Sequence, residues 1–348
     1  MFVNSDNYIK YLKIWLIGLF LLIVLMVAVG GLTRLTDSGL SITAWELFSG
    51  ILPPLNSNDW NMYFEEYKKI PEYKNINYGM SLKEFKIIFY WEYAHRLLAR
   101  IVGLFTLIPL IIFWIKYRDS NFYSNKYFLI FFLICLQGFL GWFMVTSGLT
   151  QNNDVSHFRL AIHLSLALFI LCLIFWYILD FFDIQKIDYK IPQSLLLFIF
   201  LLIIIQIILG AFLSGLNGGL IYNTWPDMNG TFFPNDVLLL DLFTSESFYN
   251  TSIIQFLHRS TAYLLVILVM IINYLFIKEG VAIKNIILFD IALLIQILLG
   301  IITLISGVEI KYASLHQLGS IFVLTTYILL IYKNSRGFLK QLKFVMKH

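Results

Sequence analysis

Long runs of apolar residues dominate the chain and predict eight membrane-spanning helices. A helix needs about 20 mostly apolar residues to cross a bilayer, and eight segments satisfy this condition. They are residues 14–34, 93–116, 127–147, 159–180, 192–214, 255–277, 283–305 and 315–333. The pattern therefore predicts an all-α polytopic membrane protein whose solvent is the lipid bilayer.

Composition and charge agree with this class and add an orientation. Hydrophobic residues make up 59% of the chain and charged residues 13%, with a mean hydropathy of +0.79. The net charge of +4 comes from basic residues at the two ends and in alternate loops, including the run from Lys333 to Lys347. Short cytoplasmic loops attract such residues. We therefore expect both termini in the cytoplasm and find no support for nucleic-acid binding.

The first apolar segment is expected to be a retained helix rather than a cleaved signal peptide, because it continues for a full span without a small-residue cleavage site. No Arg- and Ser-rich amphipathic presequence precedes it. These features favour a bacterial plasma (inner) membrane over an imported organellar protein. The abundance of Ile, Lys and Asn suggests an AT-rich genome.

The chain contains an internal repeat that divides it into residues 1–185 and 186–348. VGGLTRLTDSGLSITAW, ending at Trp45, aligns with LGAFLSGLNGGLIYNTW, ending at Trp225. Three further pairs follow in order: EYAHRLLARIVG with QFLHRSTAYLLV, QGFLGWFMVTSGL with QILLGIITLISGV, and RLAIHLSLA with YASLHQLGS. Each half holds four helices, so both enter the membrane from the same side. This predicts two parallel four-helix repeats.

Four histidines occupy corresponding places, one near the start of each even-numbered helix. They are His95, His163, His258 and His316. All four helices run from outside to inside, so the imidazoles are expected near the outer face. Two histidines per half can ligate one heme iron from both sides, which predicts two bis-histidine sites. Zinc or copper remains an alternative, but a tetrahedral site would need all four rings to converge. His157, in a short outer loop, is expected at the surface.

The two halves differ beside their first histidine. Glu92 precedes His95 by three residues on one helix face, whereas the neutral Gln255 precedes His258. A carboxylate can move protons or stabilise positive charge, and an amide cannot. This asymmetry assigns turnover to the N-terminal half and a retained cofactor to the C-terminal half. The alternative is that Glu92 is a wet interfacial residue in the aromatic belt.

Each of these first histidines is followed by an arginine, Arg96 or Arg259. Either guanidinium could reach the lipid headgroups or pair with heme propionates. Corresponding placement beside two heme sites favours the propionate or a local charge-balancing role for at least one. Cys135 and Cys172 lie inside predicted helices and are assigned no chemistry.

Two functions of other classes fit parts of this pattern. A diheme electron-transfer cytochrome would also use two bis-histidine hemes, although transfer across the bilayer favours hemes at two depths. A transporter would use the duplicated halves for alternating access, but the spans lack the interrupted helices and midplane charges expected of one. The cytochrome is therefore the main alternative.

The residues around the histidines resemble the heme A synthase family over nearly the whole chain. The segments that carry the resemblance are GGLTRLTDSGLSITAW, WEYAHRLLAR, RLAIHL, LSGLNGGLIYNTWPDMNGTFFP, QFLHR and ASLHQLGS. Some members have a cysteine pair in the first outer loop, and residues 35–92 have none. The chain is thus similar to the proteobacterial and mitochondrial-type members, and a thiol-based step is in doubt.

The resemblance implies an oxidoreductase that hydroxylates a methyl group of heme O twice, after which loss of water leaves the formyl group of heme A. It implies heme b as cofactor on His258 and His316, substrate heme O at His95 and His163, and Glu92 as the essential acidic residue. The product would serve assembly of aa3-type cytochrome oxidase. The implied partners are an electron donor without assigned identity, heme O synthase and oxidase assembly factors.

Overall fold

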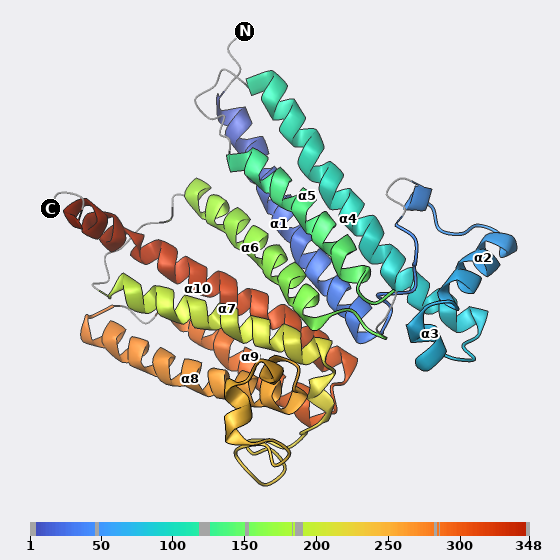
Figure 1. Cartoon of the computed structure of the whole chain (residues 1–348). Helices are drawn as coiled ribbons and strands as arrows, with labels where there is room; N and C mark the ends of the chain where they lie inside the picture. The colour runs from blue at the N-terminus through green and yellow to red at the C-terminus, as the bar shows by residue number, and fades with distance from the viewer. Residues whose placement is uncertain are drawn as a thin grey trace. The chain divides into compact units, whose positions relative to one another are not determined.

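The computed structural model describes residues 5–45, 49–117, 126–149, 153–182, 184, 191–281, 284 and 286–345. Within these ranges the chain forms helices and no β-strand, which confirms the all-α class. Eight helices are long and apolar enough to cross a bilayer, which confirms the eight predicted spans (Figure 1). They are α1 (Ser5–Leu35), α4 (Leu82–Tyr117), α5 (Lys126–Val145), α6 (His157–Phe181), α7 (Gln193–Gly215), α8 (Thr251–Lys278), α9 (Ile287–Ile305) and α10 (Ile310–Val345).

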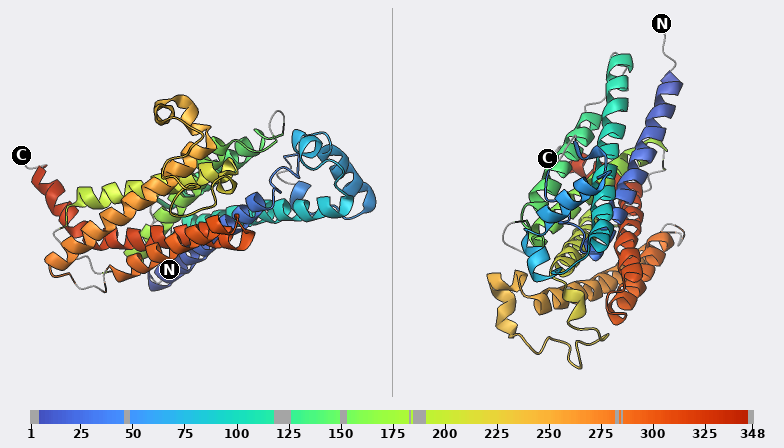
Figure 2. Two further views of the ribbon diagram at one scale, coloured as in Figure 1. Left: turned by 90° about the horizontal axis from the view of Figure 1, so that it is seen from below. Right: turned by 90° about the vertical axis from the view of Figure 1, so that its right-hand side faces the viewer.

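The chain divides into two compact units, Met1–Ile174 and Phe175–His348. In the first, α4 packs against both α1 and α5. In the second, α7 packs against α8 and α10, and α9 packs against α10 (Figure 2). Each unit contains two of the four repeated histidines. The predicted boundary between residues 185 and 186 lies outside the described residues, so the division of the chain into 1–185 and 186–348 stays a prediction.

Several helices extend beyond their predicted spans, α4 and α10 furthest. Helix α4 begins at Leu82 rather than at residue 93, because Ser81 and Glu84 form a capping box at its start. The Glu84 carboxylate accepts hydrogen bonds from the Ser81 backbone N–H and hydroxyl at 2.8 and 2.7 Å, as this motif requires. Helix α10 continues past residue 333 to Val345. Hydropathy marks only the part of a helix inside the lipid, so it misses both extensions.

The segment between α1 and α4, predicted as a long outer loop, folds into a small aromatic subdomain. It contains α2 (Ser57–Tyr67) and α3 (Pro71–Asn75). Trp60, Phe64 and Tyr67 share one face of α2 and are buried, as expected for residues spaced by one helical turn. They pack on the start of α4, with ring centroids 5.0 Å apart for Trp60 and Phe89 and 4.9 Å for Phe64 and Phe85. This cluster holds the outer end of α4 in place.

A buried carboxylic acid gives this subdomain a predicted pH dependence. Glu72 is 4% exposed, and Tyr67 donates a 2.7 Å hydrogen bond to it. Burial, assisted by the negative charges of Asp154, Glu92 and Asp37, raises the pKa of Glu72 to about 8. The folded state therefore binds the proton more tightly than the unfolded state does.

We expect the stability that comes from the raised pKa of Glu72 to be complete below about pH 4.5 and lost as pH rises through about 8. Hydrogen exchange of residues 57–77 should accelerate between pH 6 and pH 9, after correction for intrinsic exchange. Glu72→Gln should abolish this pH-dependent acceleration of hydrogen exchange, since the amide does not titrate. An equal acceleration in the wild-type protein and in Glu72→Gln would show that Glu72 is not its cause.

The segment that joins α7 to α8 contains three short 3-10 helices, η2 (Gly218–Leu220), η3 (Leu239–Phe243) and η4 (Ser245–Phe248). Asp236 ties it to α8. Its carboxylate accepts hydrogen bonds from the Tyr222 hydroxyl at 2.6 Å and the Ser252 hydroxyl at 2.7 Å. The backbone around Tyr222 is thereby held over the outer end of α8.

Candidate functional site

In the first unit, both predicted histidines face a glycine on the preceding spanning helix. His95 on α4 lies against Gly30 of α1, where an added Cβ would be 3.0 Å from Nε2 of the ring. His163 on α6 lies against Gly141 of α5, where an added Cβ would be 3.1 Å from Cε1. Each imidazole of the first unit therefore lies against a helix position that carries no side chain.

The second unit has the corresponding arrangement. His258 on α8 lies against Gly210 of α7, and His316 on α10 lies against Gly300 of α9; added Cβ atoms would be 3.1 and 2.8 Å from the respective Cε1 atoms. Each glycine leaves room for an imidazole that any larger side chain would displace.

The ring nitrogens and their surroundings fit ligands of a heme iron. Nδ1 of His316 lies 3.2 Å from the backbone carbonyl of Gln296, an arrangement that keeps the proton on Nδ1 and leaves Nε2 to bind metal. Nδ1 of His258 is buried without a hydrogen-bond partner. Among the described residues, no group of three or more His, Cys, Asp or Glu could hold a metal ion. The described residues therefore do not form the four-ligand cluster that a tetrahedral zinc site needs.

Glu92 is buried beside His95 rather than exposed to solvent at a membrane interface. It is 3% exposed, and both carboxylate oxygens accept hydrogen bonds. Oε2 accepts from the Ser41 hydroxyl at 2.7 Å and the Ile42 backbone N–H at 2.8 Å. Oε1 accepts from Arg96 Nη2 at 2.7 Å and Nε at 3.0 Å. The carboxylate is thus held by hydrogen bonds to both of its oxygens and balanced by a guanidinium.

The corresponding Gln255 is also buried, at 1% exposed. Its amide donates a 2.9 Å hydrogen bond to the carbonyl of Tyr222, while its own oxygen is buried without a partner. Tyr222 aligns with Ile42 in the repeated segments. Both side chains therefore hold the same part of an outer segment, but only Glu92 brings a charge there.

The two arginines make corresponding contacts in the two units. Arg96 donates to the carbonyls of Ile42 and Ala44 at 2.7 and 2.8 Å. Arg259 donates to the aligned carbonyls of Tyr222 and Thr224 at 2.8 and 2.9 Å. Each guanidinium group therefore holds the backbone of the segment that follows the preceding spanning helix. Their pairing with heme propionates stays a prediction.

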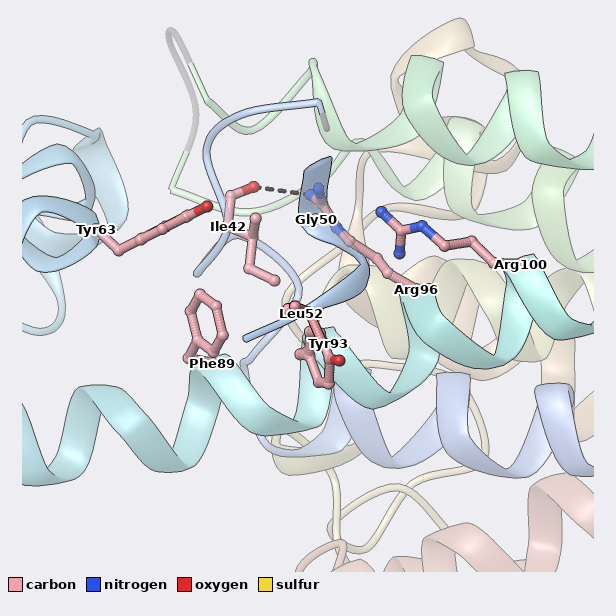
Figure 3. Close-up of a pocket in the computed structure, with 8 residues that line it drawn as sticks. All are labelled: Ile42, Gly50, Leu52, Tyr63, Phe89, Tyr93, Arg96 and Arg100. Atoms are coloured by element: carbon pink, nitrogen blue, oxygen red, sulfur yellow. Dashed lines mark hydrogen bonds between the residues drawn. The ribbon is translucent and has the colours of Figure 1, made fainter. Parts of the chain in front are cut away.

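A small cleft beside Arg96 contains a second arginine that the sequence analysis did not single out. Figure 3 shows Arg96 and Arg100 both extending from α4 toward the backbone near Gly50. The cleft is lined by Ile42, Gly50, Leu52, Tyr63, Phe89, Tyr93, Arg96 and Arg100. The four-residue spacing of the two arginines, which places them on one helix face, was the available signal. Tyr263 holds the aligned place in α8, so this pair of cations belongs to the first unit.

One expectation about the remaining candidates was wrong. His157 is buried, at 8% exposed, because it is the first residue of α6 rather than part of an exposed loop. Its ring packs on Phe158 with centroids 4.3 Å apart. Cys135 is exposed and Cys172 partly exposed, and neither forms a disulfide.

Comparison with known proteins establishes the family. Residues 13–328 match the model of the cytochrome oxidase assembly protein family. A heme A synthase of Pelagibacter ubique (strain HTCC1062) is 73% identical over 335 residues, which cover 96% of this chain and 100% of that protein. The chain belongs to the heme A synthase family. Another similar protein is the heme A synthase of Rickettsia bellii (strain OSU 85-389), which is 43% identical over 92% of this chain and 97% of its own length. The heme A synthase of Wolbachia pipientis wMel is 42% identical over 89% of both chains.

Membership confirms the resemblance drawn from the sequence. The segments that carried it, from Gly30 to the one that ends at Ser320, lie within the matched residues 13–328. The eight helices of this chain that are long and apolar enough to cross a bilayer make it a multi-pass membrane protein.

Proposed function

We propose that this chain is a heme A synthase, an oxidoreductase that converts the substrate heme O to heme A for assembly of aa3-type cytochrome oxidase. Its family supports this proposal. The observation that carries it is the buried carboxylate of Glu92 one turn from His95, where the second unit has the neutral Gln255. Two similar histidine pairs thus differ in the charge available for chemistry.

The C-terminal half is proposed to hold heme b between His258 and His316. The close glycines and the buried, unpaired Nδ1 of His258 support this assignment. A heme in that place supplies one-electron redox chemistry. The protein's own contribution is to fix both imidazoles and to exclude water around them.

The N-terminal half is proposed to bind heme O between His95 and His163. A methyl group of the bound heme O would be hydroxylated twice, with dioxygen as oxidant and electrons from the donor, and loss of water from the resulting geminal diol would leave the formyl group. Glu92 stabilises positive charge or accepts a proton there. Arg96 keeps the carboxylate oriented through its two hydrogen bonds, and with Arg100 it offers cationic groups for substrate propionates; Arg259 is the corresponding candidate at the other site.

Extraction of the hemes from purified protein tests this function against the alternative of a diheme electron-transfer cytochrome. A heme A synthase should carry heme O or heme A beside heme b, whereas the cytochrome should carry heme b alone. Supplying heme O together with dioxygen as oxidant and a reductant should convert heme O to heme A only in the first case. The electron donor, heme O synthase and oxidase assembly factors are the proposed partners.

The proposed location is the bacterial plasma membrane with both termini in the cytoplasm. Basic residues gather in segments that alternate with short, lysine-poor outer loops. Alkaline phosphatase fused after α10 should be inactive and a fluorescent protein fused there should fold, whereas phosphatase fused after Ser147 should be active. An active phosphatase at the C-terminus would reverse the orientation.

A further inference from the structure

A glutamine accompanies three of the four histidines, and the fourth has a methionine in its place. Gln137, Gln206 and Gln296 each stand four residues before the glycine that faces a histidine, on the same helix face. Before Gly30, which faces His95, the residue at this spacing is Met26. The difference lies within the first unit, between its two histidines.

The glutamine side chains contact the histidines directly. Gln137 and Gln296 donate hydrogen bonds to the backbone carbonyls of His163 and His316, at 3.0 and 2.9 Å. The amide of Gln137 also lies 3.2 Å from both ring nitrogens of His163. Gln206 contacts the ring of His258 instead, with 3.3 Å between the amide nitrogen and Nε2. Each bond joins a histidine to the preceding spanning helix.

Two features indicate that the glutamine positions are shaped for this contact. A Cβ at Gly319, one turn after His316, would collide with Oε1 of Gln296. The side-chain oxygens of Gln137, Gln206 and Gln296 are all buried without a hydrogen-bond partner. Each oxygen is therefore free to accept a further hydrogen bond beside its histidine, the kind of outer contact that orients metal ligands.

His95 also differs from the other three histidines in the orientation of its ring. His163, His258 and His316 all present Cε1 as the nearest atom to the facing glycine. His95 presents Nε2, with Cδ2 next at 3.4 Å. The three imidazoles with a glutamine share one orientation, and the imidazole beside Met26 has another.

We propose that Gln137, Gln206 and Gln296 are positioning residues that fix His163, His258 and His316. His95 has no such glutamine, which leaves its ring free to turn. The proposal rests on the proposed function, in which His95 and His163 bind the substrate. A substrate heme has to enter and its product has to leave, so one of its ligands needs freedom to turn. A resident heme gains from two fixed ligands, and the second unit has glutamines at both.

Heme-loaded, detergent-purified protein can test this proposal through Gln296→Met, which copies the side chain found at Met26. Loss of an outer contact to a ligand typically weakens metal binding 10- to 100-fold. We therefore expect heme transfer to excess apomyoglobin to accelerate about tenfold or more. The low-spin EPR signal of the ferric heme should also shift, which a general loss of stability would not produce.

Two companion variants separate positioning from packing. Gly319→Ala leaves the amide in the chain but displaces it, so it should shift the EPR signal and heme release in the same direction. Leu298→Met changes an exposed residue on the same helix and should change neither. Met26→Gln should slow the release of heme O from the first unit, since the added amide can support His95.

The outcomes separate the two proposals. Wild-type protein without heme would contradict the proposed function and this inference together. Wild-type protein with histidine-ligated heme, combined with unchanged EPR signal and heme release in Gln296→Met and Gly319→Ala, would overturn the positioning role alone. A Met26→Gln variant that releases heme O at the wild-type rate would overturn the inference that the His95 ring is free to turn because it lacks a glutamine partner.

Discussion

Glu92→Gln is expected to lower the rate of heme A formation by at least roughly a hundredfold, because general acid or base groups typically contribute 10²- to 10⁴-fold. The variant should still fold, since Gln255 shows that an amide is accommodated at the aligned place. The lost charge matters more than the lost hydrogen bonds. An amide can still accept from Ser41 or Arg96, but it neither takes up a proton nor balances a developing positive charge. Heme A and heme O extracted from cells without another copy of the enzyme would measure the loss.

The structure also defines the control for this variant. Glu92 fixes the backbone at Ile42, so a fall in activity could arise from a loosened outer segment. Heme b content and melting temperature therefore have to remain near the wild-type values for the chemical role to stand. Gln255→Glu should not create a second active site, because the charge that it introduces lies beside the heme that is proposed to be retained and not beside the substrate. Heme A formation at the wild-type rate in Glu92→Gln would reduce Glu92 to a structural tether.

The spans and their order could be predicted because lipid imposes a single strong requirement on a sequence. A run of about 20 apolar residues has few other uses. The start of α4 was missed because it depends on polar chemistry outside the lipid, the capping box of Ser81 and Glu84. The aromatic subdomain was missed for a related reason. Its apolar residues recur at helical spacing in short, partly charged segments that a span-length window averages away.

The site residues were predicted from repetition rather than from geometry. Four histidines at aligned places are recognisable in one sequence, and so is the difference between Glu92 and Gln255. The glycines that face the histidines were not recognised as part of the sites, because small residues in spanning helices usually serve close packing. The glutamines were overlooked because an isolated amide gives no signal until its partner is known. Which helix faces which, and at what height, is information that a sequence pattern does not contain.

Burial of Glu92 changes what the asymmetry between the halves means. A carboxylate at a wet interface would be screened and energetically minor. Enclosed by Ser41, Ile42 and Arg96, it acts at short range in a poorly screened environment. Arg96 partly neutralises it, so the pair presents a dipole rather than a full negative charge. Arg96→Leu would remove that balance and the clamp on the Ile42 carbonyl together, which makes it a poorer probe than Glu92→Gln.

Replacement of His258 or His316 by Ala is expected to abolish the stable binding of heme b, because each change removes one of its two axial ligands. The effect should be as large in either variant, since each change removes one of the two proposed ligands and both imidazoles lie in corresponding places against a glycine. Met in place of either histidine should retain some heme with an altered absorption spectrum and a raised midpoint potential, because a thioether is a weaker ligand to ferric iron. His95→Ala and His163→Ala are the matched controls: they should keep heme b and lose heme O and heme A. An unaltered heme b spectrum in both His258→Ala and His316→Ala would place the resident heme elsewhere. If His95→Ala and His163→Ala lost heme b instead, the assignments of the two halves would have to be exchanged.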